Sequence, residues 1–252
     1  MNLLSKTAAL GLLSQLSFAT YAETEVEIFG NIDVVSQYIS RGLTNAPEND
    51  AVTLQALLNI NIDQFYLFYW GSTLNYSFRE IQTGQRYSSD RFEHDFGAGY
   101  SFDYAGVNID IWDAFYYYQG GENTTSNELG VTLTKSLSET DEIRLGLTTY
   151  LYDVVYMNQW DTYLQLEYSK QINDQLSASV TTGFSYFNDQ GKYEGGLFLD
   201  TKSDYAFRFA ALQLNYSISS NVTGYGQFIF GGHDRSDIKQ KNTLVIGLNY
   251  AF

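Results

Sequence analysis

The last ten residues of the chain, Thr243-Leu-Val-Ile-Gly-Leu-Asn-Tyr-Ala-Phe252, alternate between two kinds of side chain. Every second residue is large and apolar or aromatic, and the residues between them are mostly small or polar. Because successive side chains of a β-strand point to opposite faces, this pattern predicts a strand with one apolar face.

The same alternation recurs from residue 26 onward in segments of about ten residues, the length that crosses a bilayer when a strand is tilted. Twelve segments can be counted, and the apolar face of each is assigned to the outside. In the third segment this outward face is Tyr66, Phe68, Trp70, Leu74 and Tyr76, and Ser72 and His94 are assigned outward as well.

The connections between segments fall into two classes that alternate along the chain. Short turns are expected at 61–64, 103–106, 137–141, 173–174 and 219–221. Longer polar loops are expected at 40–50, 79–90, 120–126, 153–158, 188–203 and 232–241. Short turns at one end, long loops at the other and an even strand number predict an all-β fold, an antiparallel up-and-down transmembrane β-barrel of about 12 strands.

The N-terminus has the order of a secretory signal peptide. Lys6 precedes an apolar run that ends in small residues, so residues 1–22 are interpreted as a signal peptide cleaved after Ala22, with Ala19 as the alternative. Residues 23–252 then form the barrel. No later stretch has the 18 or so consecutive apolar residues of a transmembrane helix.

Composition agrees with this class. Aromatic residues make up 17% of the chain, with 21 glycines and one proline, as expected for aromatic girdles, strands and tight turns. There is no cysteine, which excludes disulfides and thiolate chemistry. The net charge is −15, or −16 without Lys6, which argues against nucleic-acid binding.

Two segments break the alternation. Asp113 shares the parity of Ile109 and Ile111, so a β-bulge near residues 111–112 is predicted to turn it into the lumen. In the tenth segment Phe207 and Phe209 share one parity and Leu212 has the other, which predicts a second bulge near residues 210–212.

The opposite parity predicts the lumen. The candidate lumen-lining charged residues are Asp33, Arg41, Glu93, Asp95, Asp110, Asp113, Arg144, Glu167 and Arg208. Such charges either pair and plug the barrel or line a narrow wetted channel. Eight strands are filled by side chains and sixteen leave an open pore, so a count of twelve leaves both readings open. Arg41 is expected at the extracellular mouth, facing Glu93 or Arg91.

Catalytic signals are scarce. The only histidines are His94 and His233, and neither a Gly-rich phosphate loop nor an HExxH spacing occurs. No catalytic, metal or cofactor site is therefore predicted. A lipid-facing pair of Ser72 and His94 resembles outer-membrane phospholipase A, but strand pairing is expected to place Ser72 near Gly97 instead.

Three short motifs stand out along the chain: Ser36-Gln-Tyr-Ile-Ser-Arg-Gly-Leu-Thr44, Phe92-Glu-His-Asp-Phe-Gly-Ala-Gly-Tyr100 and Phe115-Tyr-Tyr-Tyr-Gln-Gly120. They resemble motifs of the TorF-like porin family, also called Gcw_chp, which comprises bacterial proteins of unknown function; the last motif has Gln119 where the family usually has proline. The resemblance implies an outer-membrane barrel and a pore, with no known substrate. The terminal Phe252 likewise resembles the assembly signal of outer-membrane barrels.

These observations predict an outer-membrane porin of a Gram-negative bacterium, passing small hydrophilic solutes passively with a weak preference for cations. The alternatives are a non-conducting receptor or scaffold barrel and, less favoured, a lipid-facing hydrolase. The expected partners are outer-membrane lipid and lipopolysaccharide, the barrel-assembly machinery and periplasmic chaperones, and the solutes themselves.

Overall fold

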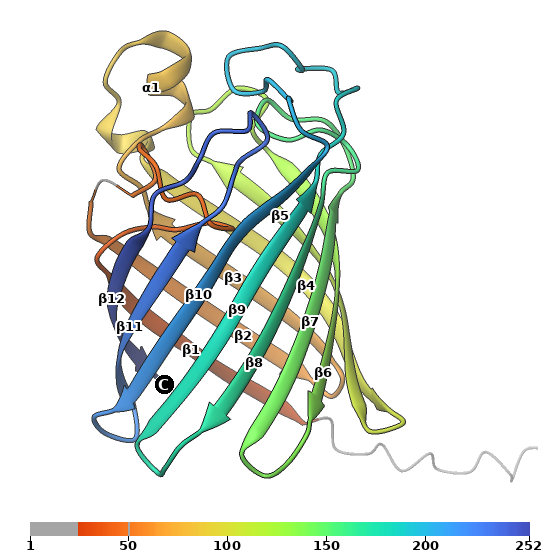
Figure 1. Cartoon of the computed structure of the whole chain (residues 1–252), viewed down its shortest axis with the longest axis vertical. Coiled ribbons are helices and arrows are strands. Elements are labelled where there is room, and N and C mark those ends of the chain that lie inside the picture. The colour runs from red at the N-terminus through yellow and green to blue at the C-terminus, as the bar shows by residue number, and fades with distance from the viewer. Residues whose placement is uncertain (1–24, 50) are drawn as a thin grey trace, which may run out of the picture.

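The alternating segments form twelve antiparallel strands that close into one barrel (Figure 1). The computed structural model describes residues 25–49 and 51–252, so the predicted signal peptide lies outside the described residues. The strands are β1 (Val26–Val35), β2 (Thr53–Ile62), β3 (Phe65–Thr73), β4 (Phe92–Tyr104), β5 (Val107–Tyr118), β6 (Ser126–Ser136), β7 (Asp141–Tyr150), β8 (Thr162–Gln171), β9 (Leu176–Tyr186), β10 (Tyr205–Ser217), β11 (Val222–Gly231) and β12 (Thr243–Ala251).

Short and long connections alternate as predicted. The short turns lie at the end of the barrel that holds the C-terminus, and the long loops gather at the other end (Figure 1). The loop between β3 and β4 carries a short helix, α1 (Phe78–Thr83), and a 3₁₀ turn, Ser88–Asp90. Within the described residues, no helix has the length and apolar character needed to cross a membrane.

The last residue takes part in closing the barrel. β12 pairs with β1, and beyond the end of β12 the backbones of Phe252 and Gly30 exchange two hydrogen bonds of 3.0 Å. Gly30 leaves room for the Phe252 ring, since a Cβ atom there would lie 2.8 Å from it. The contact gives Phe252 a structural role at the seam between the first and last strands.

The outward faces carry large, exposed apolar side chains, as predicted for most strands. Representative members are Ile32, Val34, Leu54, Phe96, Leu147, Val180, Leu212, Leu214 and Ile246. A soluble protein rarely exposes an apolar surface of this extent, because each apolar group in water costs free energy.

The prediction for the third strand is wrong. Phe65 and Leu67 are the exposed residues of β3, whereas Tyr66, Phe68 and Trp70 point into the barrel. The run Phe65–Trp70 is apolar on both faces, so alternation alone gives it no phase. Glycines on the inner face of β4 decide it, since the rings of Tyr66 and Phe68 lie over Gly99 and Gly97.

The bulge predicted near Asp113 is absent. β5 pairs with β4 and β6 in unbroken register through Ile111, Trp112 and Asp113. Asp113 therefore stays on the outer face, and Trp112 points inward over Gly130. The Asn127 amide on the outer face of β6 donates to the Asp113 carboxylate at 2.8 Å, which partly satisfies the charge without a bulge.

The second bulge exists but lies earlier than predicted. The register between β9 and β10 shifts between Phe207 and Phe209, so Arg208 is the extra residue. Phe207 points outward, and Arg208 and Phe209 are both buried inside. The bulge thus brings an arginine and an aromatic ring into the lumen at neighbouring positions.

Candidate functional site: the lumen and its constriction

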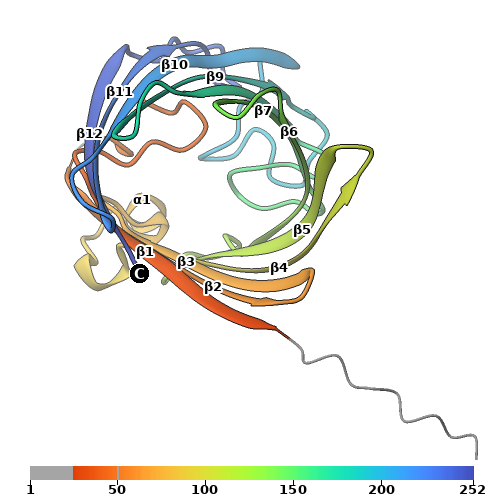
Figure 2. The same cartoon turned by 90° about the horizontal axis from the view of Figure 1, so that it is seen from below.

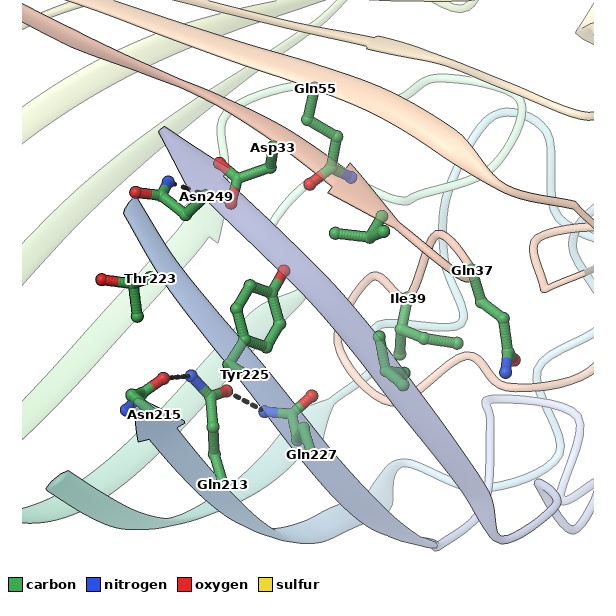
Figure 3. Close-up of a pocket in the computed structure, with 12 residues that line it drawn as sticks. Asp33, Gln37, Ile39, Gln55, Gln213, Asn215, Thr223, Tyr225, Gln227 and Asn249 are labelled. Atoms are coloured by element: carbon green, nitrogen blue, oxygen red, sulfur yellow. Dashed lines mark hydrogen bonds between the residues drawn. The ribbon is translucent and has the colours of Figure 1, made fainter. Parts of the chain in front are cut away.

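The half of the lumen nearer the short turns holds a cavity of about 440 Å³. Its wall comes from β1, β2, β10, β11 and β12, whose inner faces carry amides, hydroxyls and one carboxylate (Figure 3). The Asn249 amide donates to Asp33 at 3.0 Å, and Gln227, Gln213 and Asn215 form a hydrogen-bonded chain. A wall of this chemistry is wetted by water and offers hydrogen bonds to a polar solute.

The adjoining wall, on β3 and β5, is aromatic. Three rings cover glycines of the strands beside them: Tyr66 and Phe68 of β3, and Trp112 of β5. Trp70 of β3 instead lies across from Asp95. The Tyr66 hydroxyl donates to Asp110 at 2.9 Å. The inner surface of the barrel thus has an aromatic part and an amide-rich part.

Toward the long loops the lumen narrows, because the loop between β1 and β2 folds inward over its described residues 36–49. Figure 2 shows this loop, in orange, running inside the ring of strands. Ile39 packs against the buried inner-face residues Phe209, Ile229 and Val245. Farther along the loop, Thr44 is fully buried and bonds to Gln240 and Lys241.

The ion pair of Arg41 and Glu128 lies at the centre of this constriction. The Arg41 guanidinium meets the Glu128 carboxylate at 2.5 Å, and Glu128 is 0% exposed. The Tyr116 hydroxyl also donates to Glu128, at 2.7 Å. The rings of Tyr163 and Tyr150 lie 4.9 and 5.7 Å from the guanidinium, within the range of cation–π attraction.

Glu93 and Asp95 lie beside this pair on the inner face of β4. The hydroxyls of Tyr38 and Tyr118 donate to Glu93 at 2.7 and 2.6 Å. Asp95 is 7% exposed, and its Oδ1 atom is buried without a hydrogen-bond partner. We call the group Tyr38, Arg41, Trp70, Glu93, Asp95, Tyr116, Tyr118, Glu128, Tyr150 and Tyr163 the constriction cage.

The three motif segments found in the sequence meet in this cage. The segment 36–44 supplies Tyr38 and Arg41, the segment 92–100 supplies Glu93 and Asp95, and the segment 115–120 supplies Tyr116 and Tyr118. Gly42 follows Arg41 with φ +76°, and a Cβ atom there would lie 2.7 Å from the Phe209 ring. The Arg-Gly pair therefore lets the loop turn tightly against β10.

A vestibule of about 280 Å³ lies between the cage and the long loops. Arg208 borders it, donating from Nε to the Arg41 carbonyl at 3.2 Å. On the loop side, Arg235 pairs with Asp161 at 2.9 Å and ties the last loop to the start of β8. Burial raises the pKa of the Asp161 carboxyl, and the attraction of Arg235 offsets this only in part.

The predicted site residues thus divide into three groups. Arg41, Glu93, Asp95 and Arg208 surround the constriction, whereas Asp33, Asp110, Arg144 and Glu167 lie on the inner face nearer the short turns. Asp113 is not a lumen residue, because it lies on the outer face.

Arg41 lies near Glu93, one of the two residues it was expected to face, but Glu93 is not its ion-pair partner. Arg41 pairs with Glu128 on β6, while Arg91 pairs with Glu80 in the β3–β4 loop at 3.0 Å. Burial alone would raise the pKa of Glu80, but hydrogen bonds from Tyr87 and Arg91 hold it below its ordinary value.

Sequence reasoning missed the luminal tyrosines and tryptophans. For Tyr66, Phe68 and Trp112 the signal was the inward-facing glycines Gly99, Gly97 and Gly130, which leave room for rings of the strand beside them.

Ser72 and His94 do not meet. Ser72 is buried on the inner face and pairs across with Glu93, not Gly97 as predicted. His94 lies on the outer face, where its ring bonds to the Tyr69 hydroxyl at 2.9 Å and contacts Phe92. In the described part of the chain, no three histidine, cysteine or acidic residues are grouped so as to hold a metal ion.

The chain is similar to one protein family in sequence and to several solved porins in structure. The family model described as "Bacterial protein of unknown function (Gcw_chp)" matches residues 19–141, which confirms the resemblance over that range. No curated protein matches the chain.

Solved porins share the fold. The KdgM porin is 10% identical, with a TM-score of 0.58 over 89% of this chain and 99% of that chain. The NanC porin is 12% identical, with a TM-score of 0.57 over 87% of this chain and 98% of that chain. At these identities the likeness defines a shared porin-like barrel fold.

Proposed function

We propose that the protein is an outer-membrane porin that lets small hydrophilic solutes diffuse passively, with a weak preference for cations. One observation carries this proposal: a polar cavity of about 440 Å³ lies inside a closed barrel whose outer face is apolar. An apolar exterior suits lipid, and the closed barrel satisfies its backbone hydrogen bonds there. The wetted interior then offers a path across the membrane.

The cation preference follows from the charges that face inward. Inward-facing carboxylates outnumber inward-facing arginines. The carboxylates are Asp33, Glu93, Asp95, Asp110, Glu128 and Glu167, and the arginines are Arg41, Arg144 and Arg208. Charges that line a narrow, low-dielectric pore act more strongly than charges in bulk water. The preference should grow at low ionic strength, where screening is weakest.

A non-conducting receptor or scaffold barrel is the second candidate, and the infolded loop between β1 and β2 favours it. The two candidates share the outer-membrane location and differ in conductance. Purified protein in planar bilayers should give discrete current steps and a reversal potential of cation-preferring sign in a salt gradient. The complete absence of current would leave the receptor as the function.

Location can be tested independently. The protein should be recovered in the outer-membrane fraction and show heat-modifiable migration on gels. Deleting Phe252 should impair assembly, because this removes the backbone contacts with Gly30 at the seam. A mature chain found soluble in the periplasm would contradict the proposed function.

A further inference from the structure

The constriction cage holds three carboxylates and one cation. Glu93 accepts from two tyrosine hydroxyls, and Glu128 binds Arg41 and Tyr116 through Oε2, whereas Oε1 of Glu128 and Oδ1 of Asp95 are both buried without a hydrogen-bond partner. Asp95 lies within electrostatic reach of both other carboxylates and of Arg41. A buried carboxylate without a partner is costly unless it binds a cation or a proton.

Arg41 is seated in the cage as a small cationic ligand would be. It arrives on the loop between β1 and β2 and not on a strand, and it binds one carboxylate and two aromatic rings. Its Nη1 atom is buried and makes no hydrogen bond. The guanidinium therefore leaves one donor unused in a cage that also holds two unpaired carboxylate oxygens.

We propose that the constriction cage is a binding site for organic cations that carry a guanidinium or primary ammonium group, and that Arg41 is its tethered occupant. This inference rests on the proposed channel function and names the class of solute. A passing cation exchanges with Arg41 at Glu128 and is also attracted by Asp95. The tyrosines and Trp70 stabilise it through their ring faces.

The surrounding spaces fit such a route. The vestibule of about 280 Å³ lies on the loop side of the cage, and the cavity of about 440 Å³ lies on the other side. Both exceed the volume of a guanidinium with a short alkyl chain. In the vestibule, its alkyl part would contact rings such as Tyr118, Tyr150 and Phe187.

A matched pair of probes tests the charge requirement. n-Butylguanidinium and n-butylurea have nearly the same shape, and only the first is charged. Isothermal titration into the detergent-solubilised, folded barrel should show saturable binding of n-butylguanidinium and none of n-butylurea. Equal binding of the two probes, or binding of neither, would overturn the inference.

Two variants then locate the site. Asp95→Asn keeps the size of the side chain and should weaken n-butylguanidinium binding at least tenfold. Arg41→Ala removes the competitor and should strengthen binding severalfold. Asp174→Asn, an exposed carboxylate in a short turn at the other end of the barrel, makes the same charge change and should leave the affinity within twofold of the parent.

The contrary outcomes are also distinct. Unchanged affinity in Asp95→Asn would move the site elsewhere, and weaker binding in Arg41→Ala would make Arg41 part of the site and not its competitor. If Asp95→Asn does not assemble, as judged by heat-modifiable migration, the two probes on the parent and Arg41→Ala still decide the question.

Bilayer recordings separate this inference from the proposed function. n-Butylguanidinium should produce brief blockades of the open channel that n-butylurea does not. Saturable binding without any channel current would contradict the porin and keep the site. Channel current that neither probe alters would keep the porin and contradict the site.

Discussion

The two halves of the lumen share one wall of strands and differ in what fills it. Near the short turns, the amides around Asp33 face an open cavity of about 440 Å³. Near the long loops, the barrel encloses buried charges on β4 and β6, because the loop between β1 and β2 enters and brings Arg41 to Glu128. The difference shows that strand number sets the width available to a barrel, whereas an infolded loop decides how much of that width stays open.

The largest expected effect would come from breaking the buried pair in the upper half. Glu128→Gln should cost about 3–5 kcal/mol of barrel stability, because it leaves the Arg41 guanidinium buried without its paired charge. Glu167→Gln is the control in the open half, where the carboxylate accepts a 3.1 Å hydrogen bond from Thr181 that the Gln carbonyl can keep. Urea unfolding in detergent or lipid vesicles measures both. Equal stability of the two variants would mean that the upper half is as open as the lower.

The outer face provides the next test, since both halves share it. Leu147 is exposed at mid-strand on β7, and Leu147→Arg should cost about 2–4 kcal/mol in lipid. Its inward neighbour Gly146 faces open space, so Gly146→Ser should be nearly neutral. If Leu147→Arg assembles and melts like the parent, the assignment of inside and outside on β7 fails.

A smaller change in stability is expected from a substitution at Asp113. Its size tells whether this side chain lies on the outer wall or in the lumen. Asp113→Leu should change stability by less than about 1 kcal/mol in either direction, because a costly outward charge is exchanged for the loss of one hydrogen bond. Asn127 keeps a second acceptor, the Ala114 carbonyl at 3.2 Å. Failure of Asp113→Leu to assemble would favour a luminal position, as the sequence alone had suggested.

The strand count, the alternation of loops and the closed barrel follow from local patterns. Periodicity reports which residues share a face, and connection length reports which strands are neighbours. The phase of β3 could not be predicted this way, because Phe65–Trp70 is apolar on both faces and Gly97 and Gly99 on another strand decide which face turns inward.

The constriction was predicted only in part. Parity places Arg41, Glu93 and Asp95 inside, but the partner of Arg41 lies 87 residues away across the lumen. Contacts across a barrel interior depend on the shear of the whole sheet and on how a loop folds, and no local pattern encodes them. The change of phase in β10 was visible in the sequence, but the bulge lies at Arg208 and not at residues 210–212. The extra side chain therefore enters the lumen.

The central claim is that a conducting lumen is narrowed by Arg41 on an infolded loop. Single-channel conductance and reversal potential in a salt gradient, measured for the parent and for Arg41→Ala, test it most directly. The account predicts current in the parent, and a larger current with stronger cation preference in Arg41→Ala, because the variant loses the positive charge at the narrowest level. No current in either protein would contradict the channel, and identical conductance and reversal potential in both would contradict the constriction.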